Sequence, residues 1–341
     1  MELDSALKIN ATKFGSAAIP DEAHEFNNYL MDLMSKGPKW YEVGAPKHRQ
    51  MRIDGQTPLP KPRYLDSAED FDIPSRDAGR AIPCRLLRPQ NGPARAVYLH
   101  FHSGGWVLGD QKTQDMMLQD IANRTNTLAF SVGYRHAPED PFPAGPNDCY
   151  DAAQWLVDNA ESTLEVPLGF CGGESAGAHL GFLVMLHLLQ SPEAKYAGFR
   201  FKGMILNFGC YSLSWLPSMH HFKKPKTLIL DRQLMDEYVK AFLPGMSEEE
   251  KKHPSVSPLY ADLEPLRGKL PPAIFTVGTE DCLMDDTILM SAKYMMAGGE
   301  ATVKVVPGAA HAYITFSREV KGTGADEGLT AVEAFMRSQL N

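Results

Sequence analysis

The chain has 341 residues, of which 43% are hydrophobic and 22% are charged. This composition excludes a disordered, collagen-like or small disulfide-stapled chain and fits one or two globular domains. Its 42 acidic and 34 basic residues give a formal net charge of −8, which argues against a nucleic-acid partner. We also expect no membrane span, because no stretch approaches the roughly 18 apolar residues that a membrane helix needs, and no secretion signal, because residues 1–10 contain no apolar core.

The first 80 residues differ in character from the rest of the chain. The spacing of four apolar side chains predicts an amphipathic helix over residues 23–35, and an irregular, proline-rich stretch follows at residues 55–62. From about residue 85 onward, short apolar runs alternate with helical patterns. The runs predict buried strands at residues 95–101, 127–132, 164–171, 201–208, 273–277 and 302–306. The stretches between and after them predict helices at residues 113–123, 148–160, 176–189, 286–297 and 327–340.

This alternation is typical of an α/β fold, in which helices cover both faces of a mostly parallel sheet. One segment interrupts it. Residues 211–269 contain helical pieces and prolines but no strand pattern. A long insertion of this kind after a strand indicates a cap over a site.

The strongest functional signal is the sequence Gly173-Glu174-Ser175-Ala176-Gly177, which lies between a predicted strand and a predicted helix. A G-x-S-x-G sequence in this context is the pattern of a nucleophile elbow, a sharp turn that raises the serine hydroxyl above the sheet. The crowded turn leaves no room for a Cβ two residues before or after the serine. The helix N-terminus directs partial positive charge toward a developing oxyanion. The alternative is a glycine-rich turn in which Ser175 only caps the helix.

A second signal is the His-Ser-Gly-Gly-Trp sequence at residues 102–106, directly after another predicted strand. Acyl transfer through a tetrahedral intermediate needs backbone N–H donors aimed at the new oxyanion. A glycine pair can present such donors without side-chain obstruction. We expect Gly104 and Gly105 to be two of the donors, and Ala176, which follows the serine, to be the third.

These two sequences and four others resemble the hormone-sensitive-lipase-like family of α/β-hydrolases, in its carboxylesterase and lipase branch. The family's motifs are His-Gly-Gly-Gly, Tyr-Arg-x-Ala-Pro-Glu, Pro-Phe-Pro-Ala, Gly-Asp-Ser-Ala-Gly, Asp-Pro-Leu and a late His-Gly-Phe. Their counterparts here lie at residues 102–105, 134–139, 141–144, 173–177, 281–283 and 311–313. The resemblance covers about two thirds of the chain and implies an α/β-hydrolase fold, with a mostly parallel central sheet, flanking helices and a helical cap.

The change of pattern near residue 80 and the strandless insertion also predict a division of the chain. Residues 1–80 would be the N-terminal part of the cap, and residues 81–341 would form the catalytic domain, interrupted by a cap insertion at about residues 211–269. The family's order of nucleophile, acid and histidine then places two further catalytic groups.

His311 is the only histidine after the predicted strand at residues 273–277, so it is the expected base. Four acids compete at the end of that strand: Glu280, Asp281, Asp285 and Asp286. The resemblance favours Asp281. Asp285 and Asp286 suit the first turn of the following helix, where acidic side chains interact favourably with the helix dipole.

The sequence departs from the family pattern at four positions, none of which removes a catalytic group: Ser103 for Gly, Gly133 for Asp, Glu174 for Asp and Cys282 for Pro. We expect His102 to hold the oxyanion loop by hydrogen bonds and His100 to be a packed strand residue. Arg135 and Glu139 are expected to form a structural ion-pair network. The candidates for an acyl or alcohol pocket are Ser103, Trp106, Tyr211, Trp215, Met219 and Phe222, although such side chains are more often plain core.

The sequence therefore predicts a serine hydrolase that cleaves carboxylic esters of small or medium acyl chains through a Ser175, His311 and Asp281 triad and an acyl-enzyme, with no metal and no cofactor. The same triad would serve a specialised-metabolite hydrolase, a lactonase, an acyltransferase or a cyclase. A non-catalytic ligand receptor is a remote alternative. We expect a cytoplasmic monomer or homodimer with a small-molecule ester as its partner, because five cysteines without metal-site spacing suit a reducing compartment.

Overall fold

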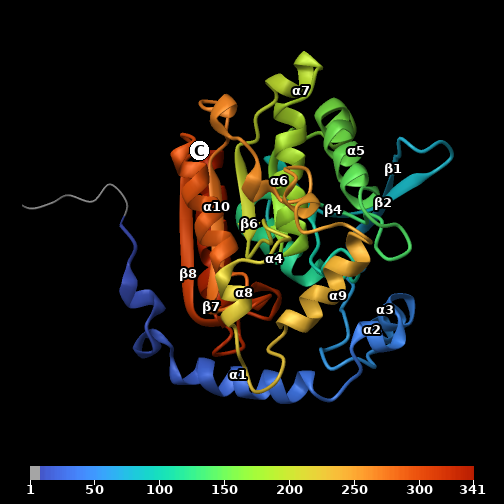
Figure 1. The fold of residues 1–341 in the computed structure, drawn as a ribbon. Helices are drawn as coiled ribbons and strands as arrows, with labels where there is room; N and C mark the ends of the chain where they lie inside the picture. The colour runs from blue at the N-terminus through green and yellow to red at the C-terminus, as the bar shows by residue number, and fades with distance from the viewer. Residues whose placement is uncertain (1–7) are drawn as a thin grey trace, which may run out of the picture.

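A computed structural model describes residues 8–341, so the first seven residues of the range expected to form the cap lie outside the described part. Eight strands form one sheet in the order β1-β2-β4-β3-β5-β6-β7-β8 (Figure 1). The β2 strand runs antiparallel to both of its neighbours, and the pairs from β4 to β8 are parallel, which confirms the mostly parallel sheet. The strands are β1 (Glu69–Pro74), β2 (Ala81–Leu87), β3 (Ala96–Phe101), β4 (Thr127–Val132), β5 (Leu168–Glu174), β6 (Gly203–Asn207), β7 (Ala273–Glu280) and β8 (Ala301–Ala310).

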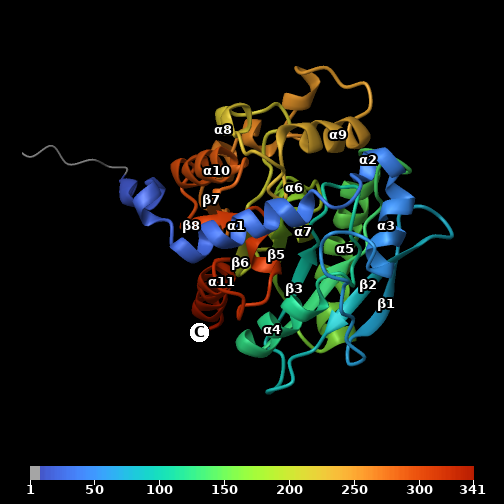
Figure 2. The same cartoon turned by 90° about the horizontal axis from the view of Figure 1, so that it is seen from below.

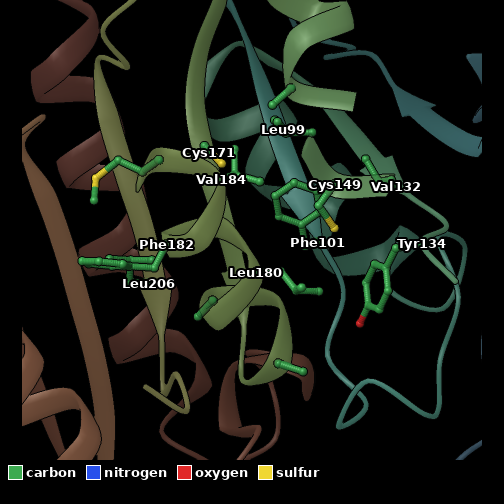
Figure 3. Packing of buried hydrophobic residues seen from close by; sticks show 14 of the residues in the cluster. Leu99, Phe101, Val132, Tyr134, Cys149, Cys171, Leu180, Phe182, Val184 and Leu206 are labelled. Carbon is green, nitrogen blue, oxygen red and sulfur yellow. The ribbon is translucent and has the colours of Figure 1, made fainter. Parts of the chain in front are cut away.

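Helices cover both faces of the sheet, as Figure 2 shows. One face carries α5 (Ala144–Asn159), α6 (Ala176–Leu189), α7 (Ala194–Gly198) and α10 (Met284–Met296), and the other carries α4 (Asp115–Thr125) and α11 (Ala325–Leu340). Every residue of α6 except His187 is buried. Its Leu180, Phe182 and Val184 join strand side chains such as Leu99 and Leu206 in one apolar cluster (Figure 3). The central helix is therefore fixed by burial on all sides, and so is the turn that precedes it.

The central strands were predictable because they are buried along their whole length. All residues of β3, β4, β5 and β6 are buried, and their continuous apolar runs are typical of parallel strands covered on both faces. The β1 and β2 strands were not predicted. Because β1 lies within residues 1–80 and pairs with β2, the sheet begins at Glu69, which corrects the expected boundary of the N-terminal cap range.

The remaining helices lie beyond the carboxyl ends of the strands, and α1 crosses in front of those ends in Figure 2. They are α1 (Asp21–Met34), α2 (Trp40–Val43), α3 (Ala45–Asp54), α8 (Pro217–His221) and α9 (Arg232–Phe242). Short 3-10 turns lie at Ala11–Phe14, Ser16–Ala18, Glu250–Lys252, Pro258–Tyr260, Glu264–Leu266 and Tyr313–Thr315, and a π turn lies at Ala160–Leu164. As expected, residues 211–269 contain no strand of the sheet. Across residues 8–341, none of the helices combines the length and the apolar stretch that a bilayer crossing requires.

A buried aspartate of α5 ties the residue before β2 to the segment after β4. Asp148 is fully buried and accepts two hydrogen bonds from Arg80, both at 2.7 Å, and one from Arg135 Nη2 at 2.9 Å. Glu139 instead pairs with Arg49 of α3. Arg135 and Glu139 therefore belong to two separate ion-pair groups rather than to the single network expected.

We expect Asp148→Ala to lower the free energy of unfolding by about 3–5 kcal/mol, because it leaves two guanidinium groups without their buried partner. Urea denaturation at neutral pH measures this loss. Glu264→Ala removes an exposed pair with Arg267 and serves as the control, with an expected loss of under about 1 kcal/mol. Equal losses in the two variants would contradict the structural role of Asp148.

Candidate active site

Ser175 lies on a strained turn between β5 and α6. Its φ of 55° and ψ of −116° place it in a region that costs a non-glycine residue about 1–3 kcal/mol. Backbone hydrogen bonds hold the turn: Ser175 N–H donates to the Asn207 carbonyl at 2.9 Å. A Cβ at Gly173 or at Gly177 would lie 1.9 or 1.8 Å from the Phe101 carbonyl oxygen. Only glycine therefore fits on both sides of the serine, as the sequence indicated.

The structure brings Ser175, His311 and Asp281 into one hydrogen-bonded chain. His311 Nε2 lies 2.9 Å from Ser175 Oγ, and His311 Nδ1 lies 2.7 Å from Asp281 Oδ2. The second oxygen of Asp281 accepts the Leu283 N–H at 2.9 Å. The acid directly follows β7 and the histidine directly follows β8, so adjacent strands deliver both groups to the elbow.

The competing acids are engaged elsewhere. Glu280 pairs with Lys224. Asp285 lies in the first turn of α10 and accepts the Ser218 N–H at 2.8 Å. Asp286 accepts two backbone N–H groups, and burial raises its pKa to about 8. In residues 8–341, no group of three or more His, Cys, Asp or Glu side chains is arranged to hold a metal ion.

His102 holds the loop after β3 in place through ring stacking and hydrogen bonds. The imidazole stacks on the Tyr134 ring with 4.3 Å between centroids, and its Nδ1 donates to the Ser103 carbonyl at 2.7 Å. Tyr134 donates its hydroxyl to the His102 carbonyl at 2.8 Å. Burial lowers the pKa of His102 to about 4. A neutral imidazole thus anchors the loop, in agreement with the expectation from the sequence.

Gly104 and Gly105 adopt backbone conformations that other residues rarely take, with φ values of 124° and 61°. A Cβ at Gly104 would lie 1.9 Å from the Leu108 carbonyl oxygen, and one at Gly105 would lie 2.6 Å from the Tyr238 ring. Among the described residues, neither glycine N–H donates to a protein acceptor, and the N–H of Ala176 at the start of α6 has none either. Three unpaired donors thus flank Ser175.

Trp106 fastens the same loop to α6 and α9. Its indole N–H donates to His179 Nδ1 at 3.1 Å, and its ring stacks on Phe242 with 4.8 Å between centroids. His179 Nε2 in turn donates to the Val256 carbonyl at 2.8 Å. The histidine is completely buried, and burial lowers its pKa to about 4.

We expect His179→Gln to reduce the acid sensitivity of the fold. Between pH 6.5 and pH 4 the unfolded chain binds a proton at His179 that the folded chain does not, so this residue destabilises the fold as the pH falls, by about 1.4 kcal/mol per unit. Glutamine retains an acceptor for Trp106 and a donor for Val256 without titrating. Urea denaturation at pH 7 and pH 5 is expected to give a stability loss about 2 kcal/mol smaller in the variant than in the wild type. An equal loss of stability between pH 7 and pH 5 in the variant and in the wild type would contradict the role of His179 in acid sensitivity.

A cavity of about 640 Å³ opens over Ser175, His311 and the oxyanion loop. Its walls come from both the N-terminal segment and the insertion. The apolar side chains that line it from these two segments are Met34, Trp40, Ile53, Leu59, Ile229, Leu230, Leu234, Met235 and Tyr238. Trp40 and Tyr238 stack with 5.3 Å between centroids, and this contact joins the two segments above the site.

Two of the six expected pocket residues, Ser103 and Trp106, line this cavity. The other four do not, which corrects the prediction. Tyr211 and Met219 are buried in the core, Trp215 donates its indole N–H to Asp236, and Phe222 packs beneath the ammonium group of Lys224. Three of the lining residues that sequence reasoning missed lie on α9. The spacing of Leu234, Met235 and Tyr238 on one helical face was the signal that could have identified them.

Arg49 on α3 is another residue that the sequence did not single out. Its guanidinium donates to the Val107 carbonyl of the oxyanion loop at 2.7 Å and pairs with Glu139. The residue also lines the cavity. The N-terminal segment therefore contacts the loop that carries the glycine donors.

Comparison with known proteins places these features among characterised sequences. A family model described as the alpha/beta hydrolase fold matches residues 98–315. Carboxylesterase NlhH of Mycobacterium tuberculosis is 28% identical over 301 residues, which cover 84% of this chain and 86% of that protein. Ethyl acetate hydrolase of Pseudomonas putida is 27% identical over 279 residues, which cover 81% and 84% of the two chains. A solved esterase from Pyrobaculum calidifontis superposes with a TM-score of 0.78 at 25% identity and covers 94% of this chain and 98% of its own.

Proposed function

This chain belongs to the α/β-hydrolase family, in its hormone-sensitive-lipase-like carboxylesterase branch, and is a carboxylic ester hydrolase; from that premise we propose that it cleaves esters of small or medium acyl chains through a Ser175, His311 and Asp281 triad. The observation that carries the proposal is the unbroken hydrogen-bonded chain from Asp281 through His311 to Ser175 Oγ, with distances of 2.7 and 2.9 Å. A non-catalytic receptor would not require this arrangement.

Each group has one task in the proposed reaction. Ser175 Oγ attacks the ester carbonyl while His311 Nε2 takes its proton and then passes it to the leaving alcohol. Asp281 holds His311 in the tautomer with its proton on Nδ1 and stabilises the imidazolium. Water, deprotonated by His311, then hydrolyses the acyl-enzyme.

The oxyanion is expected to bind where unpaired N–H groups converge. The N–H groups of Gly104, Gly105 and Ala176 are the donors in this proposal, and each donor of this kind is worth about 2.7–4 kcal/mol in the transition state. The positive end of α6 adds to the field at the same point. No step of this reaction requires a metal ion or a cofactor.

We further propose that the cap consists of the segment before β1 together with the insertion at about residues 211–269. The cavity volume of about 640 Å³ and its apolar walls favour a small or medium acyl chain over a long one. The five cysteines are buried and free, which supports a reducing, cytoplasmic location. That the protein is a monomer or homodimer stays a prediction.

Hydrolysis of p-nitrophenyl acetate, butyrate, octanoate and palmitate tests the substrate class. We expect turnover of the first three and little or none of the palmitate, together with stoichiometric labelling of the protein by a fluorophosphonate. Labelling without turnover of any ester would contradict the proposed substrates and favour a specialised one. Formation of an ester product when an alcohol is added would indicate acyl transfer instead. If the protein is not labelled and turns over none of the esters, the proposed triad is contradicted.

A further inference from the structure

A buried carboxyl group lies directly beside the nucleophile. Glu174 is completely buried, and three side chains hydrogen-bond to its carboxyl oxygens. Its Oε2 accepts from Gln114 Nε2 at 2.7 Å and from His100 Nε2 at 2.9 Å, and its Oε1 faces Asn207 Nδ2 at 3.5 Å. A buried acidic group is costly unless its oxygens are satisfied, so these partners hold Glu174 in one orientation.

Gln114 connects this carboxyl group to the oxyanion loop. The residue precedes α4 and is 7% exposed. Its Oε1 accepts the Ser103 N–H at 3.2 Å while its Nε2 donates to Glu174. Because the backbone N–H of Ser103 can only donate, the oxygen of the Gln114 amide must face Ser103, and its nitrogen then faces Glu174.

The same group of residues also fixes the nucleophile. The Asn207 carbonyl accepts the Ser175 N–H, and the Asn207 side chain faces Glu174. The Ser103 N–H is used by Gln114, whereas the N–H groups of the following Gly104 and Gly105 donate to no acceptor among the described residues. One side-chain bridge thus joins the residue before the nucleophile to the residue before the glycine donors.

We propose that Gln114 and Glu174 are positioning residues that set the distance between the Gly104 and Gly105 donors and Ser175. This inference rests on the proposed function, because it assigns those donors to the oxyanion. It also gives a role to the buried carboxyl group of Glu174. Gln114 also lines the cavity, but in this proposal it acts through the loop, so its loss changes kcat rather than KM.

The expected effect is on the chemical step rather than on binding. The loss of one oxyanion donor costs about 10²- to 10³-fold in kcat, and a misplacement of about 1 Å costs up to about 10²-fold. Gln114→Met removes both hydrogen bonds at nearly constant side-chain length. We expect kcat to fall about 10- to 100-fold while KM changes little. Binding of a trifluoromethyl ketone, which forms the tetrahedral adduct, should weaken by the same factor as kcat.

Gln119→Met is the matched control. Gln119 is also 7% exposed, but its amide donates to the Arg88 carbonyl and to Asn123, away from the loop. A purely structural role of Gln114 predicts equal kcat values for the two variants once the folded fraction is equal. That result would overturn the inference.

A second test exchanges the amide and the carboxyl group between positions 114 and 174. It does not depend on whether Gln114→Met folds well. Gln114→Glu keeps an acceptor for Ser103 but sets two carboxyl groups against each other, so kcat should fall. Adding Glu174→Gln restores a donor and an acceptor across the same contact with their direction reversed. We expect the double variant to recover most of the lost kcat, and a double variant that is worse than both single variants would contradict the bridge.

The two proposals fail in different ways. Wild-type protein that hydrolyses no p-nitrophenyl ester and binds no fluorophosphonate overturns the proposed function and this inference with it. Wild-type protein that turns over esters while Gln114→Met matches Gln119→Met overturns the positioning role alone.

Discussion

Ser175→Ala is expected to abolish ester hydrolysis, with kcat for p-nitrophenyl butyrate about 10⁴- to 10⁶-fold below that of the wild type. The reason is that Ser175 Oγ is the hydroxyl within hydrogen-bonding distance of His311 Nε2, at 2.9 Å. Without it the acyl-enzyme cannot form, and the oxyanion donors alone leave only residual catalysis. Initial rates and fluorophosphonate labelling, both followed on the same preparation, measure the change.

The control for this substitution is Ser291→Ala on α10. Ser291 is buried and donates its hydroxyl to the Ile288 carbonyl, so its removal tests the cost of losing a buried serine outside the site. We expect that variant to retain wild-type rates and labelling. More than a few per cent of wild-type activity in Ser175→Ala would rule out this serine as the nucleophile.

Asp281→Asn is expected to lower kcat by about 10³- to 10⁴-fold with little change in KM. The carboxylate accepts from His311 Nδ1 at 2.7 Å and stabilises the imidazolium that forms during proton transfer. An asparagine amide at this place favours the tautomer in which His311 Nδ1 accepts, so that Nε2 carries a proton and cannot take the one from Ser175. Steady-state kinetics with p-nitrophenyl butyrate measures the effect.

The matched control is Asp285→Asn, four residues further along the chain. Its carboxylate accepts the Ser218 N–H, and an asparagine oxygen can accept the same bond. We expect kcat within about twofold of the wild type, because this acid is remote from the hydrogen-bonded chain at His311. A larger loss in Asp285→Asn than in Asp281→Asn would show that the acid of the triad has been assigned to the wrong residue.

The sequence was sufficient to predict the central strands of the sheet and the residues of the hydrogen-bonded chain at Ser175. Strands such as β4 and β5 are buried along their whole length and so carry an unmistakable apolar run. The edge strand β1 was missed because its residues Glu69, Asp70 and Asp72 are exposed and charged, a pattern that serves a solvent-facing edge but does not resemble a strand.

The cap residues that line the cavity were harder to predict than the catalytic groups at its base. Ser175, Asp281 and His311 follow strands of one sheet, and the topology of parallel strands brings such positions together. Whether an aromatic side chain in a cap faces the cavity depends on how its helix packs. Tyr211 faces the core beside Phe182, whereas Tyr238 faces the site. The spacing of Tyr238 with Leu234 and Met235 marks an apolar helical face, but the spacing alone does not say whether that face packs on the core or lines the cavity.

The stacking of Trp40 on Tyr238 bears on how the protein is assembled during synthesis. Trp40 leaves the ribosome well before Tyr238, so the N-terminal helices have no partner ring until most of the sheet has been made. The enclosure over the site therefore closes late, after β6 and the helix that carries Tyr238 have emerged. Selection can also alter this enclosure, and with it the range of esters admitted, through residues that take no part in the chemistry.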